Sequence, residues 1–286
     1  MFNDSLKKEA LKIHEHSYEK YNSSYQKMSD ACECLYATRI KAVELVSFVQ
    51  KIVNSIANTP KSFDIQLRKI SQQVYIFHDT EEFARRSYEE SVRAGTNTAY
   101  ASIAGVSVAT LAPTALACIA TTFGTASTGT AISALSGAAA QKAAVAWIGR
   151  TFAGFAVEGS AGMLAGQAFL ALVGPIGWSI AGVTAGLALI KFSNKNKEIA
   201  DDAFAEAKEM YKAKEALDEA SASIIALNTK TNMLYIDLID KKWELLDYAN
   251  KDYASIEESQ KFFLGMIINN TLSLSHILNE SILQYE

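Results

Sequence analysis

The sequence predicts an all-α protein, an elongated antiparallel helical bundle or coiled coil with a central apolar, Gly/Ala-rich helical hairpin region. Two charged stretches repeat apolar residues at steps of three and four, and no segment shows the alternation of apolar and polar residues that strands require. Composition divides the 286 residues into three parts. Residues 1–93 and 191–286 are predicted to form N- and C-terminal long helices, and residues 94–190 a membrane-active hairpin region.

The N-terminal part carries a heptad stripe that contains one charged residue, Arg39. A period of 3.5 residues keeps these positions on one side of a helix that packs along a partner. Asn58-Thr59-Pro60 should end this helix, because proline disfavours helix at the preceding residue. A second helix is expected from about Ser62. The stripe comprises Tyr21, Tyr25, Met28, Cys32, Leu35, Arg39, Ala42, Val46, Val49, Val53 and Ile56, and the inward positions of the second helix are Ile65, Ile70, Val74, Phe77 and Phe83.

The C-terminal part repeats this pattern in a helix expected to begin near Asn196. A last helix is expected over about 253–284. The simpler interpretation is that both stripes form the core of a helical bundle. The alternative is that they are open coiled-coil surfaces that bind a partner. The second stripe comprises Met210, Ala213, Leu217, Ala220, Ile224, Leu227, Thr231, Leu234, Leu238, Lys241 and Leu245, and the inward residues of the last helix are Ile256, Phe262, Phe263, Met266, Ile267, Leu272, Ile277 and Ile282.

The central part is nearly free of charge. Its 97 residues hold only Lys142, Arg150 and Glu158 as charged side chains, together with 14 of the 15 glycines. A helix needs about 20 apolar residues to cross a bilayer, and Thr98–Phe123 and Gly162–Ile190 supply them. The predicted membrane-inserting residues are Tyr100, Ile103, Val106, Val108, Leu111, Leu116, Ile119, Phe123, Leu164, Phe169, Leu170, Leu172, Val173, Ile176, Trp178, Ile180, Val183, Leu187, Leu189 and Ile190.

Glycine spacing and flanking charge predict how these spans are arranged. Rows of small residues let helix backbones approach closely, and a Gly-Pro-Ile-Gly sequence should break the second span. Arginines precede the central part and lysines follow it, so both ends should lie on the same side of a membrane. An even number of crossings, hence a hairpin, is expected. The packing glycines are Gly162, Gly166, Gly182 and Gly186, and the hairpin break is Gly174, Pro175 and Gly177.

Three interpretations of this central part remain open. It inserts conditionally from a soluble form, it anchors a coiled-coil protein permanently, or it forms part of a permanently soluble scaffold. Tyr100, Trp147 and Trp178 fit either interfacial anchors or core aromatics. A protein with two charged helical arms around such a segment is best explained by two states, one stored in water and one in a membrane.

A long helical stalk interrupted by an apolar, Gly/Ala-rich hairpin resembles the α-helical pore-forming toxins of the cytolysin A and haemolysin BL type. The order of the parts is also similar to apolipoprotein L-like proteins and, more loosely, to pore-forming colicins. The resemblance implies a soluble monomer that converts to a membrane oligomer, either a homo-oligomer or one that includes related partner subunits. The chain departs from these toxins in its larger apolar part and in an N-terminus without the apolar stretch of a Sec signal. We therefore expect synthesis in the cytoplasm, then a soluble cytoplasmic or non-classically exported form that associates with membranes.

Other function classes are disfavoured. A net charge of −4 without a basic stripe argues against nucleic acid, and no phosphate loop, nucleophile elbow or dinucleotide fingerprint suggests an enzyme, a cofactor or a small-molecule substrate. The three cysteines fit reduced thiols. His14-Glu15-His16 lacks zinc-site spacing and is interpreted as a solvated face. His78 and Asp79 fit an ordinary polar surface as well as an acid-base pair.

Overall fold

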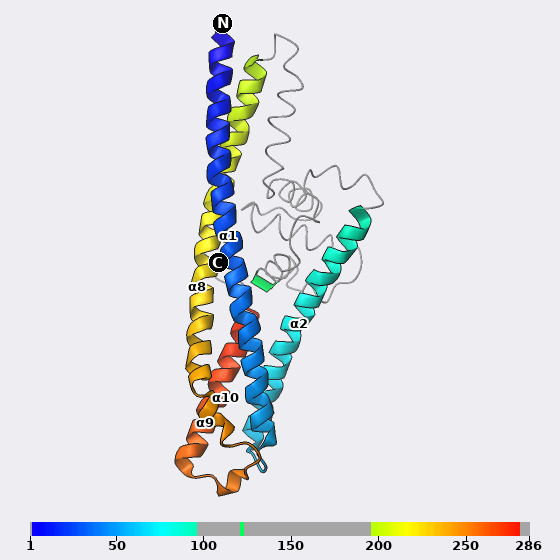
Figure 1. The fold of residues 1–286 in the computed structure, drawn as a ribbon, viewed down its shortest axis with the longest axis vertical. Coiled ribbons are helices and arrows are strands. Elements are labelled where there is room, and N and C mark those ends of the chain that lie inside the picture. The colour runs from blue at the N-terminus through cyan, green and yellow to red at the C-terminus, as the bar shows by residue number, and fades with distance from the viewer. Residues whose placement is uncertain (1, 96–120, 123–195, 281–286) are drawn as a thin grey trace. The chain divides into compact units, whose positions relative to one another are not determined.

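The computed structural model describes residues 2–95, 121–122 and 196–280 (Figure 1). This part of the chain is mostly helical and contains no strand, so the all-α prediction is confirmed for it. The elements in order are α1 (Phe2–Ser55), α2 (Lys61–Gly95), α8 (Asn196–Asp240), α9 (Lys242–Leu246), the 3-10 helix η5 (Tyr253–Ser255) and α10 (Glu258–Ile277).

The described residues belong to two compact units. Unit 1 contains residues 2–31, 85–95 and 196–222, and unit 2 contains residues 32–84, 121–122 and 223–280. The boundaries fall inside α1, α2 and α8, so each of these helices contributes to both units. This division follows packing, whereas the three parts expected from the sequence follow composition.

The heptad stripe of α1 is buried as predicted. All eleven positions from Tyr21 to Ile56 are buried, and Arg39 is among them. The stripe of α8 is also confirmed: its described positions are buried or half-buried from Met210 onward. The helix ends at Asp240, yet Leu245 in α9 is still buried, so the apolar register continues across the break at Lys241.

In unit 1, α1 and α8 run in the same direction. Ala10 packs with Ala200 and Ala203, and further along both helices the Asp218 carboxylate accepts hydrogen bonds from Lys214 and Ser24. The antiparallel prediction is therefore wrong for this pair. A heptad pattern determines which side of a helix is buried, but it does not determine the direction of the partner helix.

The α1–α8 contact also affects the pKa of the Asp218 carboxyl. Burial raises the pKa of this carboxyl, but the hydrogen bonds from Lys214 and Ser24 and the charges of Lys214 and Lys27 together hold the pKa below its usual value. The carboxylate of Asp218 is thus stabilised in its ionised form beside α1.

Unit 2 is built around one apolar core to which α1, α2, α8, α9 and α10 contribute. Val46 of α1, Ile70 of α2, Leu238 of α8 and Leu264 of α10 all belong to it and are almost fully buried. Such a core removes apolar surface from water, which is the main favourable term in folding.

Two of the predicted inward residues face outward instead. Ile65 is 49% exposed and Phe262 is 79% exposed. On α10 the buried side chains include Leu264, Ile267 and Leu274, and helical geometry places Phe262 off that face. The side chains of Ala213, Phe83 and Ile282, also predicted to be inward, lie outside the described ones.

The last helix begins later than predicted. Tyr253–Ser255 form a separate 3-10 turn, and α10 starts after Glu257. The Glu257 side chain accepts a hydrogen bond from the backbone N–H of Gln260, and Gln260 Oε1 accepts one from the backbone N–H of Glu257. This reciprocal capping box satisfies helix N–H groups that would otherwise lack partners.

The turn after α1 pairs with the loop before α10. The backbone N–H of Ala57 donates to Lys251 O at 2.9 Å, and Tyr253 N–H donates to Ala57 O at 2.9 Å. Asn58 (φ 56°) adopts the left-handed conformation, which asparagine tolerates better than most residues. The predicted break at Asn58-Thr59-Pro60 is confirmed, and the structure adds that the break is tied to the second half of the chain.

Candidate functional site

The predicted membrane-inserting residues, the packing glycines and the hairpin break all lie outside the described residues. Within the described ranges, no helix combines the length and the apolar character that crossing a membrane requires. The strongest candidate site in the described part is therefore the environment of a buried charge, Arg39, on the predicted stripe of α1.

Arg39 is completely buried and donates to three backbone carbonyls of unit 2. Its Nη1 lies 2.8 Å from Thr121 O, and its Nη2 lies 2.7 Å from Glu280 O and 3.3 Å from Ile277 O. The planar guanidinium presents five N–H donors in a fixed fork, so it can bind carbonyls from different segments at once. Arg39 thus joins α1, the end of α10 and residue 121.

The end of α10 is a suitable place for a buried cation. The last carbonyls of a helix have no intrahelical donors, and they carry the negative end of the helix dipole. Arg39 supplies donors to Ile277 O, at the last residue of α10, and to Glu280 O just beyond it. This arrangement offsets part of the cost of removing the guanidinium from water.

Two other helices bind the segment that follows α10. Asn279 Nδ2 donates to Gln73 O and Gln73 Oε1 on α2, each at 2.8 Å. Lys230 Nζ on α8 lies 3.0 Å and 3.1 Å from the two carboxylate oxygens of Glu280. We call the set that meets here the arginine junction; it consists of Arg39, Gln73, Thr121, Lys230, Ile277, Asn279 and Glu280.

Thr121 and Thr122 bring the apolar central part of the sequence into this junction. Both threonines are buried, and they lie in the long uncharged stretch that precedes Lys142. The Arg39–Thr121 hydrogen bond thus joins the N-terminal helical arm to a residue of the central part.

A second polar cluster lies nearby on α1 and α2. The Tyr36 hydroxyl donates to Glu81 Oε1, and His78 Nδ1 lies 2.9 Å from Glu81 Oε2. The Tyr36 ring stacks on Phe77 with centroids 6.4 Å apart. Of the two interpretations of His78, the acid-base pair with Asp79 gains no support, since the histidine contacts Glu81 instead. These contacts tie α2 to α1 in unit 2.

The histidines near the N-terminus behave differently from each other. His14 is buried, so the interpretation of His14-Glu15-His16 as a solvated face is wrong for His14, although His16 is well exposed. His14 lies seven residues before Tyr21 and so extends the heptad stripe of α1. Among the described residues, no group of three His, Cys, Asp or Glu side chains is arranged to hold a metal ion.

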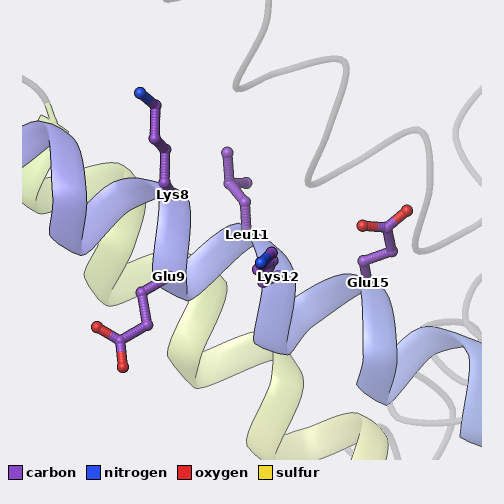
Figure 2. Close-up of a pocket in the computed structure, with 5 residues that line it drawn as sticks. All are labelled: Lys8, Glu9, Leu11, Lys12 and Glu15. Carbon is purple, nitrogen blue, oxygen red and sulfur yellow. The ribbon is translucent and has the colours of Figure 1, made fainter.

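A hollow along the first turns of α1 offers little for ligand binding. Figure 2 shows that the side chains of its lining residues spread away from the helix in different directions. Sites for small molecules usually bring a few polar groups together in an apolar cavity. The lining residues are Lys8, Glu9, Leu11, Lys12 and Glu15.

Comparison of the chain with protein-family models, with curated proteins and with solved structures finds no match. The function must therefore be argued from the residues alone. One member of the arginine junction carried a signal in the sequence, because Arg39 is the charged residue of an apolar stripe. The four other polar residues of the junction carry no such signal in the sequence, because exposed and half-buried polar residues of helices show no distinctive spacing. They are Gln73, Lys230, Asn279 and Glu280.

Proposed function

We propose that this protein converts from a soluble form to a membrane oligomer whose central part inserts into and permeabilises a bilayer. The observation that carries the proposal is the composition of residues 94–190, where 97 residues hold three charges between two charged helical arms. The resemblance to α-helical pore-forming toxins supports the same interpretation. It implies helical arms packed as a bundle or coiled coil and a central helical hairpin between them.

The described cores support a protein that keeps its arms folded while the central part changes environment. Unit 2 has its own apolar core, to which α1, α2, α8, α9 and α10 contribute. Two residues of the central part, Thr121 and Thr122, are buried in that unit. The apolar composition of residues 94–190 makes this part a reasonable candidate for burial in lipid, because a bilayer removes apolar surface from water.

A second function is favoured by a different observation. Large apolar side chains are exposed on α8 and α9, with Ile225, Met233, Ile236 and Trp243 each about half or more exposed. Ile225 and Ile236 are eleven residues apart on α8, a spacing that returns to one face of a helix, and Trp243 is exposed on the short helix that follows. Such faces occur at sites of protein–protein contact. A coiled-coil adaptor or scaffold, either soluble or permanently membrane-anchored, is therefore the alternative.

Lipid flotation distinguishes these functions. Protein purified without detergent is mixed with phospholipid vesicles that contain a trapped dye, and both co-flotation and dye release are measured. The proposed function predicts a monomer in water that floats with vesicles and releases dye. A protein that never floats leaves the soluble adaptor, and a protein that requires detergent from the start favours the permanent anchor.

The double variant Gly166→Leu/Gly182→Leu tests the packing rows in the same assay. Leucine at these positions would prevent close approach of helix backbones, so the variant should bind vesicles but release dye much more slowly than the wild type. Far-UV circular dichroism serves as the control that the arms remain helical. Unchanged dye release would contradict a role for these glycines in assembly.

A further inference from the structure

We propose that Arg39 is a latch that restrains Thr121–Thr122 against unit 2 and so sets how readily these two residues are released from it. The contact is the 2.8 Å hydrogen bond from Arg39 Nη1 to Thr121 O, inside a junction from which water is excluded at the guanidinium. The consequence for membrane insertion rests on the proposed function, but the restraint itself does not.

The proposed latch consists of two sets of hydrogen bonds, one that persists and one that breaks when Thr121 is released. Nη2 donates to Ile277 O and Glu280 O at the end of α10, and Nη1 donates to Thr121 O. If residues 121–122 depart, the guanidinium loses Thr121 O but keeps Ile277 O on α10 and Glu280 O beyond it. Unit 2 therefore retains a place for the cation in both states, as a two-state device requires.

The contact is strong enough to matter for a population. Hydrogen bonds to charged groups contribute more than neutral ones, and one such bond changes an equilibrium between held and released states by about ten- to a hundredfold. The bond counts fully only where water does not replace it; Arg39 is completely buried, and Thr121, which accepts the bond, is buried too. A latch of this size holds the segment in water and still yields to a lipid surface that binds the apolar residues.

Arginine is better suited to this task than lysine. Its fork reaches carbonyls of two separate segments with two different nitrogens, whereas an ammonium presents donors from a single point. Arg39→Lys should therefore keep the positive charge near α10 while weakening the hold on Thr121. Arg39→Met fills a similar elongated volume without donors and removes the hold entirely.

Asn279→Ala provides a matched control in the same junction. Asn279 Nδ2 donates to Gln73 O and Gln73 Oε1 at 2.8 Å. The variant loses both bonds and so weakens the attachment of the segment after α10 to α2. It leaves the hydrogen bond between Arg39 and Thr121 in place. A general loosening of the junction would appear in both variants, while the latch effect would appear only on substitution of Arg39.

The test is hydrogen exchange followed by mass spectrometry on the full-length protein in water without lipid. Peptides that contain Thr121–Thr122 should exchange at least tenfold faster in Arg39→Met than in the wild type and in Asn279→Ala, with Arg39→Lys between them. Peptides from the first half of α1 act as an internal reference. Equal exchange of the Thr121 peptides in folded Arg39→Met and wild type overturns the latch, as does equal acceleration in Asn279→Ala.

Dye release separates the latch from the proposed function. If both hold, Arg39→Met reaches half-maximal release at a protein concentration about tenfold lower than the wild type. Faster exchange without dye release from any variant supports the latch and refutes membrane permeabilisation. If circular dichroism shows that Arg39→Met does not fold, Arg39→Lys carries the test, and wild-type exchange in that folded variant overturns the latch.

Discussion

The two faces of α10 provide a quantitative test of the unit 2 core. Leu264 is completely buried, whereas Phe262, two residues earlier, is 79% exposed. Replacing a fully buried leucine by alanine costs the transfer free energy of the removed carbons plus the cavity they leave, about 2–5 kcal/mol. We expect Leu264→Ala to lower the free energy of unfolding by about 3 kcal/mol. Phe262→Ala removes a ring that already faces water and should change it by less than about 0.5 kcal/mol.

Urea unfolding followed by far-UV circular dichroism measures both variants against the wild type. With a denaturant slope near 3 kcal/mol/M, the expected loss in Leu264→Ala lowers the urea midpoint by about 1 M. The pair is a stringent comparison because both residues lie on the same helix, and the sequence pattern predicted Phe262 to be inward but not Leu264. A cost for Phe262→Ala equal to that for Leu264→Ala would refute the assignment of the buried face.

Two further predictions concern polar contacts of unit 2. The hydrogen bond from Lys241 (2.5 Å), with another from Asn270 (2.9 Å), holds the pKa of Asp237 below its usual value; its stabilisation is therefore present above the unfolded pKa of about 3.9 and lost as pH falls toward the folded pKa. Asp237→Asn should flatten the fall in urea midpoint over that acid interval, and an unchanged slope would contradict the contribution of this carboxylate. Asn58→Ala should cost about 1–2 kcal/mol in urea unfolding, since alanine is strained at φ 56° and loses the bond to Asp252, while Asn58→Gly should cost less. An Asn58→Gly variant less stable than Asn58→Ala would show that backbone strain at this position has been misjudged.

Periodicity was a reliable guide where a long helix buries one continuous face. The eleven stripe positions of α1 share a single spacing, and that spacing alone identifies the buried side. Pro60 likewise marked the end of α1, because its effect on the preceding residue is local and steric. The stripe of α8 was identified for the same reason, even across the break at Lys241.

The errors arose where burial depends on partners distant in sequence. Phe262 and Ile65 are apolar and helical, yet the faces that meet the core exclude them. The shared direction of α1 and α8 depends on Ala10 meeting Ala200 and Ala203, which no local pattern encodes. Arg39 was visible as the charge in an apolar stripe, but its acceptors are backbone carbonyls, and a carbonyl leaves no residue-type signal in the sequence.

Tryptophan fluorescence tests the central claim, that residues 94–190 enter the bilayer, most directly. Trp243→Phe removes the exposed tryptophan of α9 and leaves Trp147 and Trp178, both in the central part. Protein purified without detergent is added to vesicles whose lipids carry bromine on the acyl chains, and emission is compared with that in unbrominated vesicles. Insertion predicts strong quenching by the brominated chains and reduced quenching by iodide from the water. If flotation shows that the protein is bound to the vesicles and brominated lipid still leaves its emission unchanged, insertion is contradicted.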